Sequence, residues 1–332
     1  MSHPIRHLAL PVALLVLASA CSSQDPTGAS GAEASGTAAT SIPATTDESS
    51  PTLSELPEGL IVYSQRKPDG TYAIYLMKPD GTDRRSLVDT EGPDSHPTWS
   101  PDGRSVAFVG GTAAQPDIFT ISADGTGLRQ LTDTETGEDQ LVWSPNGHRI
   151  AYTTFNVESP DAGPFAVRTM APDGSGGEIV LSSGPEIPYV GLHDWSPDGA
   201  TLLLAVDDGG GGGLWAANPD GTNLRLLRES TGDFGSGAKF SPDGTEIAFQ
   251  ADLDGGCIYR SDPMATALIR LTEGCVEGFV LTWSPDGQWI MWAGGDHGPA
   301  DAQVMRRDGS ERHVVVDTAD VADVDWQPSA GR

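Results

Sequence analysis

The sequence is poor in positive charge. Nineteen Lys and Arg residues stand against 47 Asp and Glu residues among 332, which gives a formal net charge of −28 at pH 7. Because phosphate backbones are bound by basic surfaces, this balance argues against a nucleic-acid partner. The acidity indicates either ordinary colloidal solubility or a surface that attracts cations or cationic ligands.

Long apolar segments are scarce too. Residues 8–18 follow Arg6 and form an apolar stretch that is too short to span a bilayer as a helix, as in an export signal. The sequence Leu17-Ala-Ser-Ala-Cys21 resembles the bacterial lipobox. That resemblance implies removal of residues 1–20, attachment of acyl chains such as palmitate at Cys21, and anchoring to the cell membrane on the side away from the cytoplasm. The alternative is an ordinary secretory signal with an incidental Cys.

Cysteine is nearly absent, with three residues in the whole chain. Apart from Cys21, only Cys257 and Cys275 remain, both within one sequence repeat. Because an exported protein folds in an oxidising compartment, this pair predicts a disulfide, with two separate thiols as the alternative. The spacing of the pair is not that of a metal-binding CxxC motif.

Residues 22–57 contain mainly Ser, Thr, Ala, Gly and Pro, with five acidic residues and no basic one. This composition does not supply a core, so residues 21–57 are predicted to be a lipidated Cys followed by a disordered tether. A random coil of this length has a root-mean-square reach of roughly 30–36 Å.

A repeat fills the rest of the chain. Trp-Ser-Pro-Asp-Gly at residues 99–103 recurs with small changes at 143–147, 195–199, 240–244 and 283–287, and a degraded Trp-Gln-Pro-Ser stands at 326–329. The aromatic residues are 44, 52, 45, 43 and 43 positions apart. Pro, Asp and the following Gly suit a tight hairpin turn, and the Ser hydroxyl suits a hydrogen bond to the turn backbone. A period in the forties with short strands is typical of a β-propeller.

The strand after each turn has apolar residues at consecutive positions, as in Val106-Ala-Phe108, which indicates burial of both faces between neighbouring blades. The first repeat element, residues 60–63, matches a second strand, whereas the last, residues 322–327, matches a first strand. The sequence therefore predicts an all-β, six-bladed propeller over residues 58–328. Each blade has four antiparallel strands, the C-terminal strand joins the N-terminal blade, and residues 329–332 form a tail.

These repeats resemble the TolB family of WD-like propellers over about residues 60–328. The resemblance implies the propeller fold and a tendency to bind partners, and it transfers no catalytic residue. TolB has an α/β domain before its propeller, where this chain has the lipobox and tether. Because of this departure, the resemblance implies the fold but does not extend to TolB's role in the envelope.

Signatures of common enzymes are missing from the sequence. It has no Gly-x-Ser-x-Gly, no His-Glu-x-x-His and no phosphate-binding loop. The eight Trp residues lie in turn motifs or blade strands and are expected in the core rather than in a sugar-binding platform. The chain is therefore expected to bind rather than to catalyse.

Candidate ligand-binding residues occupy the segments that lead into each first strand, where a propeller has the mouth of its channel. They are Asp94, His96, Asp139, Gln140, His193, Asp194, Glu277 and Asp323. A ring of carboxylates suits a hard cation or a basic peptide, and the alternative is a set of solvated loop residues. Asp252 and Asp254 are weak calcium candidates because the rest of a calcium loop is missing, and no other cofactor is expected.

The leading hypothesis is a monomeric, membrane-anchored, extracytoplasmic propeller that binds an envelope protein or peptide at its channel mouth. One alternative is a propeller enzyme that acts on envelope polysaccharide or a small molecule through carboxylates at the same mouth. Another is an accessory lipoprotein of a neighbouring membrane system. Residue pattern alone does not choose between these functions.

Overall fold

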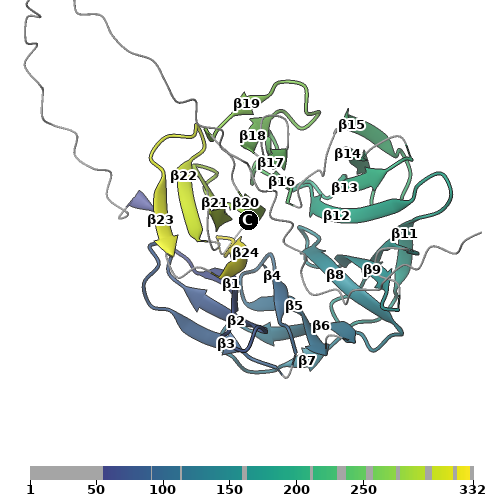
Figure 1. Cartoon of the computed structure of the whole chain (residues 1–332), viewed down its shortest axis with the longest axis horizontal. Helices are drawn as coiled ribbons and strands as arrows, with labels where there is room; N and C mark the ends of the chain where they lie inside the picture. Colours follow the sequence, from purple (N-terminus) through teal and green to yellow (C-terminus); the bar gives the residue numbers. More distant parts are fainter. Residues whose placement is uncertain are drawn as a thin grey trace, which may run out of the picture. The chain divides into compact units, whose positions relative to one another are not determined.

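A computed structural model describes most of the chain from residue 55 onward. The described residues are 55–90, 92–112, 114–158, 163–209, 212–229, 237–251, 257–273, 277–295, 301–316 and 320–329. They form six four-stranded sheets arranged radially around a common centre, as Figure 1 shows. This is the six-bladed propeller that the repeat predicts. Within those ranges, no helix is long and apolar enough to cross a membrane.

The strands of the first three blades follow the chain, except that blade 1 begins with the last strand. Blade 1 contains β24 (Val321–Trp326), β1 (Ile61–Arg66), β2 (Tyr72–Met77) and β3 (Arg85–Val88). Blade 2 contains β4 (Ser95–Trp99), β5 (Ser105–Thr112), β6 (Gln115–Ser122) and β7 (Arg129–Gln130). Blade 3 contains β8 (Thr136–Trp143), β9 (Ile150–Asn156), β10 (Ala166–Met170) and β11 (Glu178–Ser182).

The other three blades are continuous in sequence. Blade 4 contains β12 (Tyr189–Trp195), β13 (Leu202–Asp207), β14 (Gly212–Ala217) and β15 (Arg225–Glu229). Blade 5 contains β16 (Lys239–Phe240), β17 (Ile247–Ala251), β18 (Cys257–Ser261) and β19 (Ile269–Arg270). Blade 6 contains β20 (Glu277–Trp283), β21 (Trp289–Gly295), β22 (Ala302–Arg306) and β23 (His313–Val316).

The ring closes in blade 1, where the last strand pairs antiparallel with the first and Trp326 lies opposite Ile61. Gln327 secures this junction in two directions. Its side-chain oxygen accepts a hydrogen bond from the Leu60 N–H (3.0 Å), and its side-chain nitrogen donates one to the Gly103 carbonyl of blade 2 (2.7 Å). The Gln that degrades the sixth motif copy therefore joins both ends of the propeller to the next blade.

The Trp-Ser-Pro-Asp-Gly motif forms the turn between the first and second strands, as predicted. Gly103 has a φ of 67° and donates its N–H to the Ser100 carbonyl at 2.8 Å. The Ser100 hydroxyl donates to Asp102 (2.7 Å) and accepts from the Ser105 N–H (2.9 Å). A Cβ at this φ would be strained, so the motif requires Gly there.

The core is divided into six clusters of buried apolar side chains, one at each interface between neighbouring blades. Val62 packs towards blade 2, whereas its neighbours Ile61 and Tyr63 pack towards blade 6. Alternate residues of one strand thus enter different clusters, which explains the consecutive apolar positions in the sequence. Trp289 packs towards blade 1 and Trp292 towards blade 5. Both are almost completely buried, as expected of core residues.

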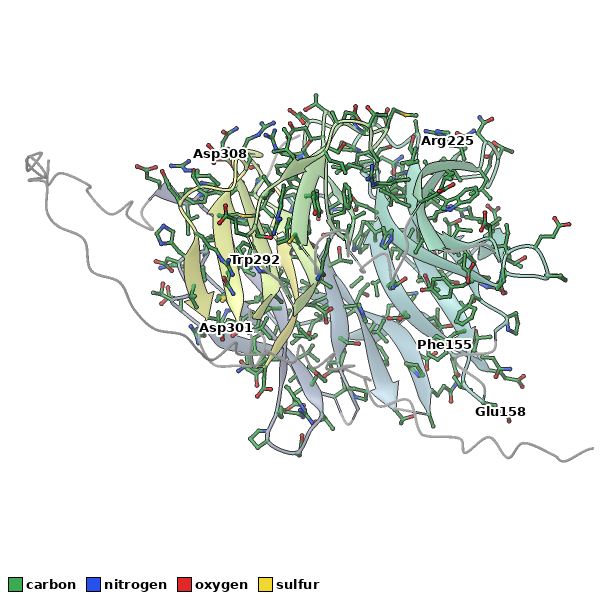
Figure 2. The ribbon with its side chains drawn as sticks, turned by 45° about the horizontal axis from the view of Figure 1, so that its top comes forward. Phe155, Glu158, Arg225, Trp292, Asp301 and Asp308 are labelled. Atoms are coloured by element: carbon green, nitrogen blue, oxygen red, sulfur yellow. The ribbon has the colours of Figure 1, made fainter. Side chains whose placement is uncertain are left out.

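The propeller has two distinct faces, which Figure 2 shows at opposite ends of the strands. The turn face carries the turns between strands one and two and between strands three and four of each blade, and Asp308 and Arg225 lie there. The loop face carries the loops between strands two and three and the connections into each first strand, and Glu158 and Asp301 lie there.

Candidate functional site

The first strand of each blade lies nearest the centre, so β24, β4, β8, β12, β16 and β20 surround the axis of the ring (Figure 1), and the region along this axis is called the channel. A β-bulge interrupts the pairing of five of these strands: β24, β4, β8, β12 and β20. Two bulge residues, His96 and Gln140, adopt positive φ values of 50° and 43°. Because a bulge changes the direction of a side chain, it displaces these groups from the regular alternation of the strand.

Each first strand is also the inner edge of its sheet, and such an edge leaves backbone N–H groups without strand partners. Side chains of the preceding blade satisfy many of them. One row of hydrogen bonds runs from His96 N to Asp323 (3.0 Å), from Leu192 N to Gln140 (3.1 Å) and from Gly237 N to His193 Nδ1 (3.3 Å). A second row runs from Trp99 N to Asp325 (2.8 Å), from Phe240 N to Asp194 (2.8 Å) and from Trp326 N to Thr282 (3.3 Å).

These rows give several predicted ligand-binding residues a structural role. Asp323, Gln140, His193 and Asp194 each connect one blade to the next by accepting a backbone hydrogen bond. A hydrogen bond to a carboxylate is stronger than one between neutral groups, so such contacts fix the spacing of the blades. The groups that line the channel are therefore held rigidly by the ring itself.

The structure brings three of the predicted residues together across blades 1, 2 and 3. His96 Nδ1 lies 3.0 Å from Asp139 Oδ1, and His96 Nε2 lies 3.8 Å from Asp323 Oδ1. Asp323 is buried and also accepts a hydrogen bond from the Ser64 hydroxyl at 2.5 Å. The side chains of His96 and Asp139 remain 30% and 38% exposed, so a ligand can reach them. We call this group the His96 triad.

Electrostatics keep His96 and Asp139 of the triad charged at neutral pH. Burial by itself lowers the pKa of His96, but the charges of Asp139 and Asp323 outweigh it and raise that pKa to about 10. Burial raises the pKa of Asp139, and the His96 charge more than reverses this effect, so the net shift is downward. The Gln140 N–H donates to the same Asp139 oxygen, Oδ1, as His96 contacts. Among the described residues, the other oxygen of Asp139 is thus left available to a ligand.

A second charged group occupies the part of the channel wall made by blades 4 and 5. The Lys239 ammonium lies 3.4 Å from Asp194 Oδ1. The Lys239 charge also opposes the rise in the pKa of His96 and of Asp325, which belong to blades 2 and 1. Since blade 2 lies across the ring from blade 5, the Lys239 charge acts across the centre of the ring.

Lys239 and Asp325 are not among the residues predicted from the sequence. Each stands immediately before the aromatic residue of a turn motif, at the position that Asp194 occupies in blade 4. Burial raises the pKa of Asp325, partly opposed by Lys239, and Asp194 behaves in the same way. The sequence signal that could have identified them is the polar residue that directly precedes the aromatic residue of these turn motifs.

The structure does not bring Asp94 to the channel mouth. Asp94 is fully buried and accepts hydrogen bonds from the Thr90 N–H (2.8 Å) and hydroxyl (2.6 Å). Glu138, near the start of β8, is buried likewise beside Thr134 and Asp117. Burial, opposed by the Thr134 hydrogen bond and reinforced by Asp117, raises the pKa of Glu138 to about 7. These acids therefore stabilise the connections between blades beneath the loop face.

Other predicted residues fall outside what the structure describes. Cys21, Cys275, Asp252 and Asp254 lie outside the described residues, and for Glu277 only the backbone of β20 is described. Cys257 is buried at the start of β18. Its disulfide with Cys275 stays a prediction, because Cys275 lies outside the described residues. In the described ranges, no group of three or more His, Cys, Asp or Glu side chains is placed to hold a metal ion.

Arginine side chains gather at the turn face, where they join blades. Arg85 donates to the Ala123 carbonyl (2.9 Å), and Arg129 donates to the Asp173 carbonyl (2.7 Å), each in the next blade's third-to-fourth turn. Arg307 similarly pairs with Glu246 of blade 5. Much of the limited positive charge is thus used at the turn face, away from Asp139 and the loop face.

Comparison with known proteins identifies the fold and the family. The family described as the TolB beta propeller domain matches residues 35–232 and 141–330. One curated relative, the uncharacterized protein YidR of Escherichia coli strain K12, is 28% identical over 101 residues, which cover 30% of this chain and 24% of YidR. The chain therefore matches about a quarter of that relative's length.

Solved structures resemble the whole propeller at low sequence identity. TolB from Acinetobacter baumannii has a TM-score of 0.69 at 19% identity, over 82% of this chain and 67% of that chain. A chain of the nidogen/laminin complex gives 0.66 at 13% identity, over 83% and 100%. An oligogalacturonate lyase in complex with manganese gives 0.54 at 16% identity, over 76% and 77%. At these identities the likeness shows the fold alone, whereas the family match extends over nearly the whole chain, which belongs to the TolB β-propeller domain family.

Proposed function

We propose that this protein is a lipid-anchored, extracytoplasmic binding module that holds a protein or peptide partner at the loop face. The observation that carries the proposal is the exposed Asp139 carboxylate, which has one oxygen available beside the charged His96. A fixed, partly exposed carboxylate at the entrance of a channel is suited to a Lys or Arg side chain of a partner. The net charge of −28 attracts such a partner from a distance.

The position of the chain ends supports this arrangement. Leu60 and Gln327 bind each other at the turn face, so a tether from Cys21 enters the propeller on the side opposite the channel mouth.

The same geometry favours binding over catalysis. Asp194, Asp323 and Asp325 each accept a backbone N–H from the next blade, so gain of a proton by any of them weakens the ring. A general acid or base has to exchange a proton in every cycle. Rigid carboxylates that hold blades together are better suited to presenting a fixed charge pattern.

The test is chemical crosslinking of the anchored protein in intact cells, followed by identification of the captured partner by mass spectrometry. Asp139→Asn keeps the shape of the side chain and removes its charge, so partner binding is expected to weaken by about tenfold. Asp83→Asn is the matched control, because Asp83 is exposed at the turn face and its positive φ of 53° suits Asn.

Thermal unfolding of both variants confirms that they fold. Capture that is lost with Asp139→Asn and retained with Asp83→Asn supports the proposal. Capture that is equal for the wild type and both variants, or that is lost with both, contradicts binding at the channel mouth.

A further inference from the structure

Two buried carboxyl groups meet where blade 2 leads into blade 3. Asp117 of β6 is 4% exposed, and Glu138 of β8 is 1% exposed. The Thr132 hydroxyl lies 3.3 Å from Asp117 Oδ1 and 3.3 Å from Glu138 Oε2. The same hydroxyl accepts the Ile118 N–H at 2.8 Å. Its single proton can therefore serve only one of the two carboxyl groups at a time.

Neutral donors hold the outer oxygens of these two groups, which we call the carboxyl pair. Gln130 Nε2 donates to Asp117 Oδ2 (3.0 Å), and the Thr134 hydroxyl donates to Glu138 Oε1 (2.8 Å). The two carboxyl groups also hydrogen-bond to each other, which raises the pKa of Glu138 and lowers that of Asp117, so Glu138 is the donor. Since a carboxylate can only accept, this bond exists only while the pair holds a proton.

The surroundings of the carboxyl pair supply no close cation. Among the described residues, neither member forms an ion pair with Lys, Arg or His. Asp133, after β7, adds a like charge that raises the pKa of the β6 member. On β9, Tyr152 interacts with the β8 member, and Arg168 of β10, which pairs with Tyr152, is the cation on that side. Asp94 packs beside Gly110, the β5 residue opposite the β6 member.

The charged residues of the other strands that pack on β8 are paired elsewhere. His96 of β4 contacts Asp139, and Asp194 of β12 contacts Lys239. The proton of the carboxyl pair is therefore held by burial and by the pair's own hydrogen bonds. A second negative charge in such a site is costly, because no partner compensates for its lost hydration.

The proton is lost near neutral pH. Burial is the main reason that the pKa of Glu138 is raised to about 7 from its ordinary value of 4.5, and burial also raises the pKa of Asp117. A raised pKa in the folded state means that the stabilisation is fully present below about pH 4.5 and is lost as the pH rises through about 7. Above that pH the pair carries two charges, and the hydrogen bond between its members is broken.

We propose that the carboxyl pair is a pH switch, in which loss of the shared proton loosens residues 131–138 and displaces Asp139, the next residue of β8. Movement on the other side of Glu138 is blocked, because a Cβ on Gly137 would lie 2.5 Å from the Phe155 ring, which is near the loop face (Figure 2). The bulge of β8, between Asp139 and Leu141, is the weaker point. The inference rests on the proposed function in so far as Asp139 is the residue that binds the partner.

The test is an NMR titration of the full chain without a partner. The side-chain carboxyl carbon of Glu138 is expected to titrate with a midpoint near pH 7 rather than near 4.5. The His96 ring reports on Asp139, because His96 Nδ1 lies 3.0 Å from Asp139 Oδ1. Since His96 itself titrates near pH 10, a change in its resonances between pH 6 and 8 reports movement of Asp139. Amide exchange of residues 131–138, corrected for intrinsic rates, is expected to be about tenfold faster at pH 8 than at pH 6.

Three variants sharpen the test. Glu138→Gln keeps a donor for Asp117 and cannot ionise, so exchange should stay slow and the His96 resonances constant from pH 6 to 8. Glu135→Gln is the matched control, because Glu135 is exposed in the same connection, and it should behave as the wild type. Asp117→Asn removes the neighbouring charge, so the Glu138 midpoint should move below pH 7. Thermal unfolding checks that each variant folds, and the wild-type titration decides the matter even if one does not.

The outcomes separate the switch from the proposed function. A Glu138 midpoint near pH 4.5, or corrected exchange that is equal at pH 6 and 8, overturns the switch. A midpoint near pH 7 with constant His96 resonances overturns its coupling to Asp139. Either result leaves the proposed function intact, because partner capture is measured separately. Conversely, capture that is indifferent to Asp139→Asn contradicts the proposed function, whereas transitions that Glu138→Gln removes from the free protein still support the switch.

Discussion

His96 shows how a single residue in this channel combines structural and functional roles. Its N–H binds Asp323 of one blade while its ring binds Asp139 of another. Its positive φ of 50° is uncommon for a residue with a side chain, and it persists because the surrounding contacts hold it. The imidazolium is thus an electrostatic link between three blades at the channel entrance.

Replacing His96 with Asn is expected to reveal this link as a dependence of stability on pH. The raised pKa means that the stabilisation is fully present below about pH 6.5, the ordinary His value, and is lost as the pH rises through about 10. The free energy of unfolding of the wild type should exceed that of His96→Asn by about 2 kcal/mol near pH 6, and this difference should shrink towards pH 10.

Urea unfolding at pH 6, 8 and 10 measures the difference. Asn is tolerated at positive φ, so the backbone of the variant is not strained. The exposed His148→Asn serves as control. A constant difference between wild type and His96→Asn over this range would rule out a charged His96.

Among the elements, the first strands have the most demanding role because they carry both the channel and the joints between blades. The N–H groups on their free edge face a neighbouring blade and not another strand, so side chains such as Asp194 and Asp325 act as acceptors. The bulges allow this by turning residues such as Gln140 out of the strand's regular alternation. The closing strand, β24, has the additional task of fixing the chain ends.

Gln327→Ala is expected to weaken that closure. The change removes one hydrogen bond to Leu60 and one to Gly103, which together correspond to about 2 kcal/mol of unfolding free energy. Gln288→Ala is the control, because Gln288 is exposed and, among the described residues, its side chain bonds only within its own turn. Thermal and urea unfolding give the comparison, and equal stabilities of the two variants would show that Gln327 does not secure the ring.

On the scale of the whole molecule, the two faces differ in their relation to the chain ends. Arginines such as Arg85 and Arg129 join blades at the turn face, where Leu60 and Gln327 also meet. The triad at the channel entrance keeps an exposed carboxylate, Asp139. Closure of the ring and the His96 triad are thereby separated in space.

Replacing Cys21 with Ser removes the thiol that a lipid requires, so the chain should move from the membrane fraction to the soluble extracytoplasmic fraction. Incorporation of labelled palmitate should be lost at the same time. Ser22→Ala, at the next residue, should leave both unchanged. Continued membrane association of Cys21→Ser after a carbonate wash would disprove the anchor.

The sequence by itself determined the blade number and the way the ring closes, because turn chemistry and consecutive apolar positions are local consequences of residue type. It also marked His96, Asp139 and Asp323 as candidates. Only the tertiary structure decided that these three meet, that Asp94 is buried, and that Lys239 approaches Asp194 of the neighbouring blade. The reason is physical: these contacts join residues of different blades, and the inter-blade spacing and bulge geometry that set them are not encoded in any one repeat.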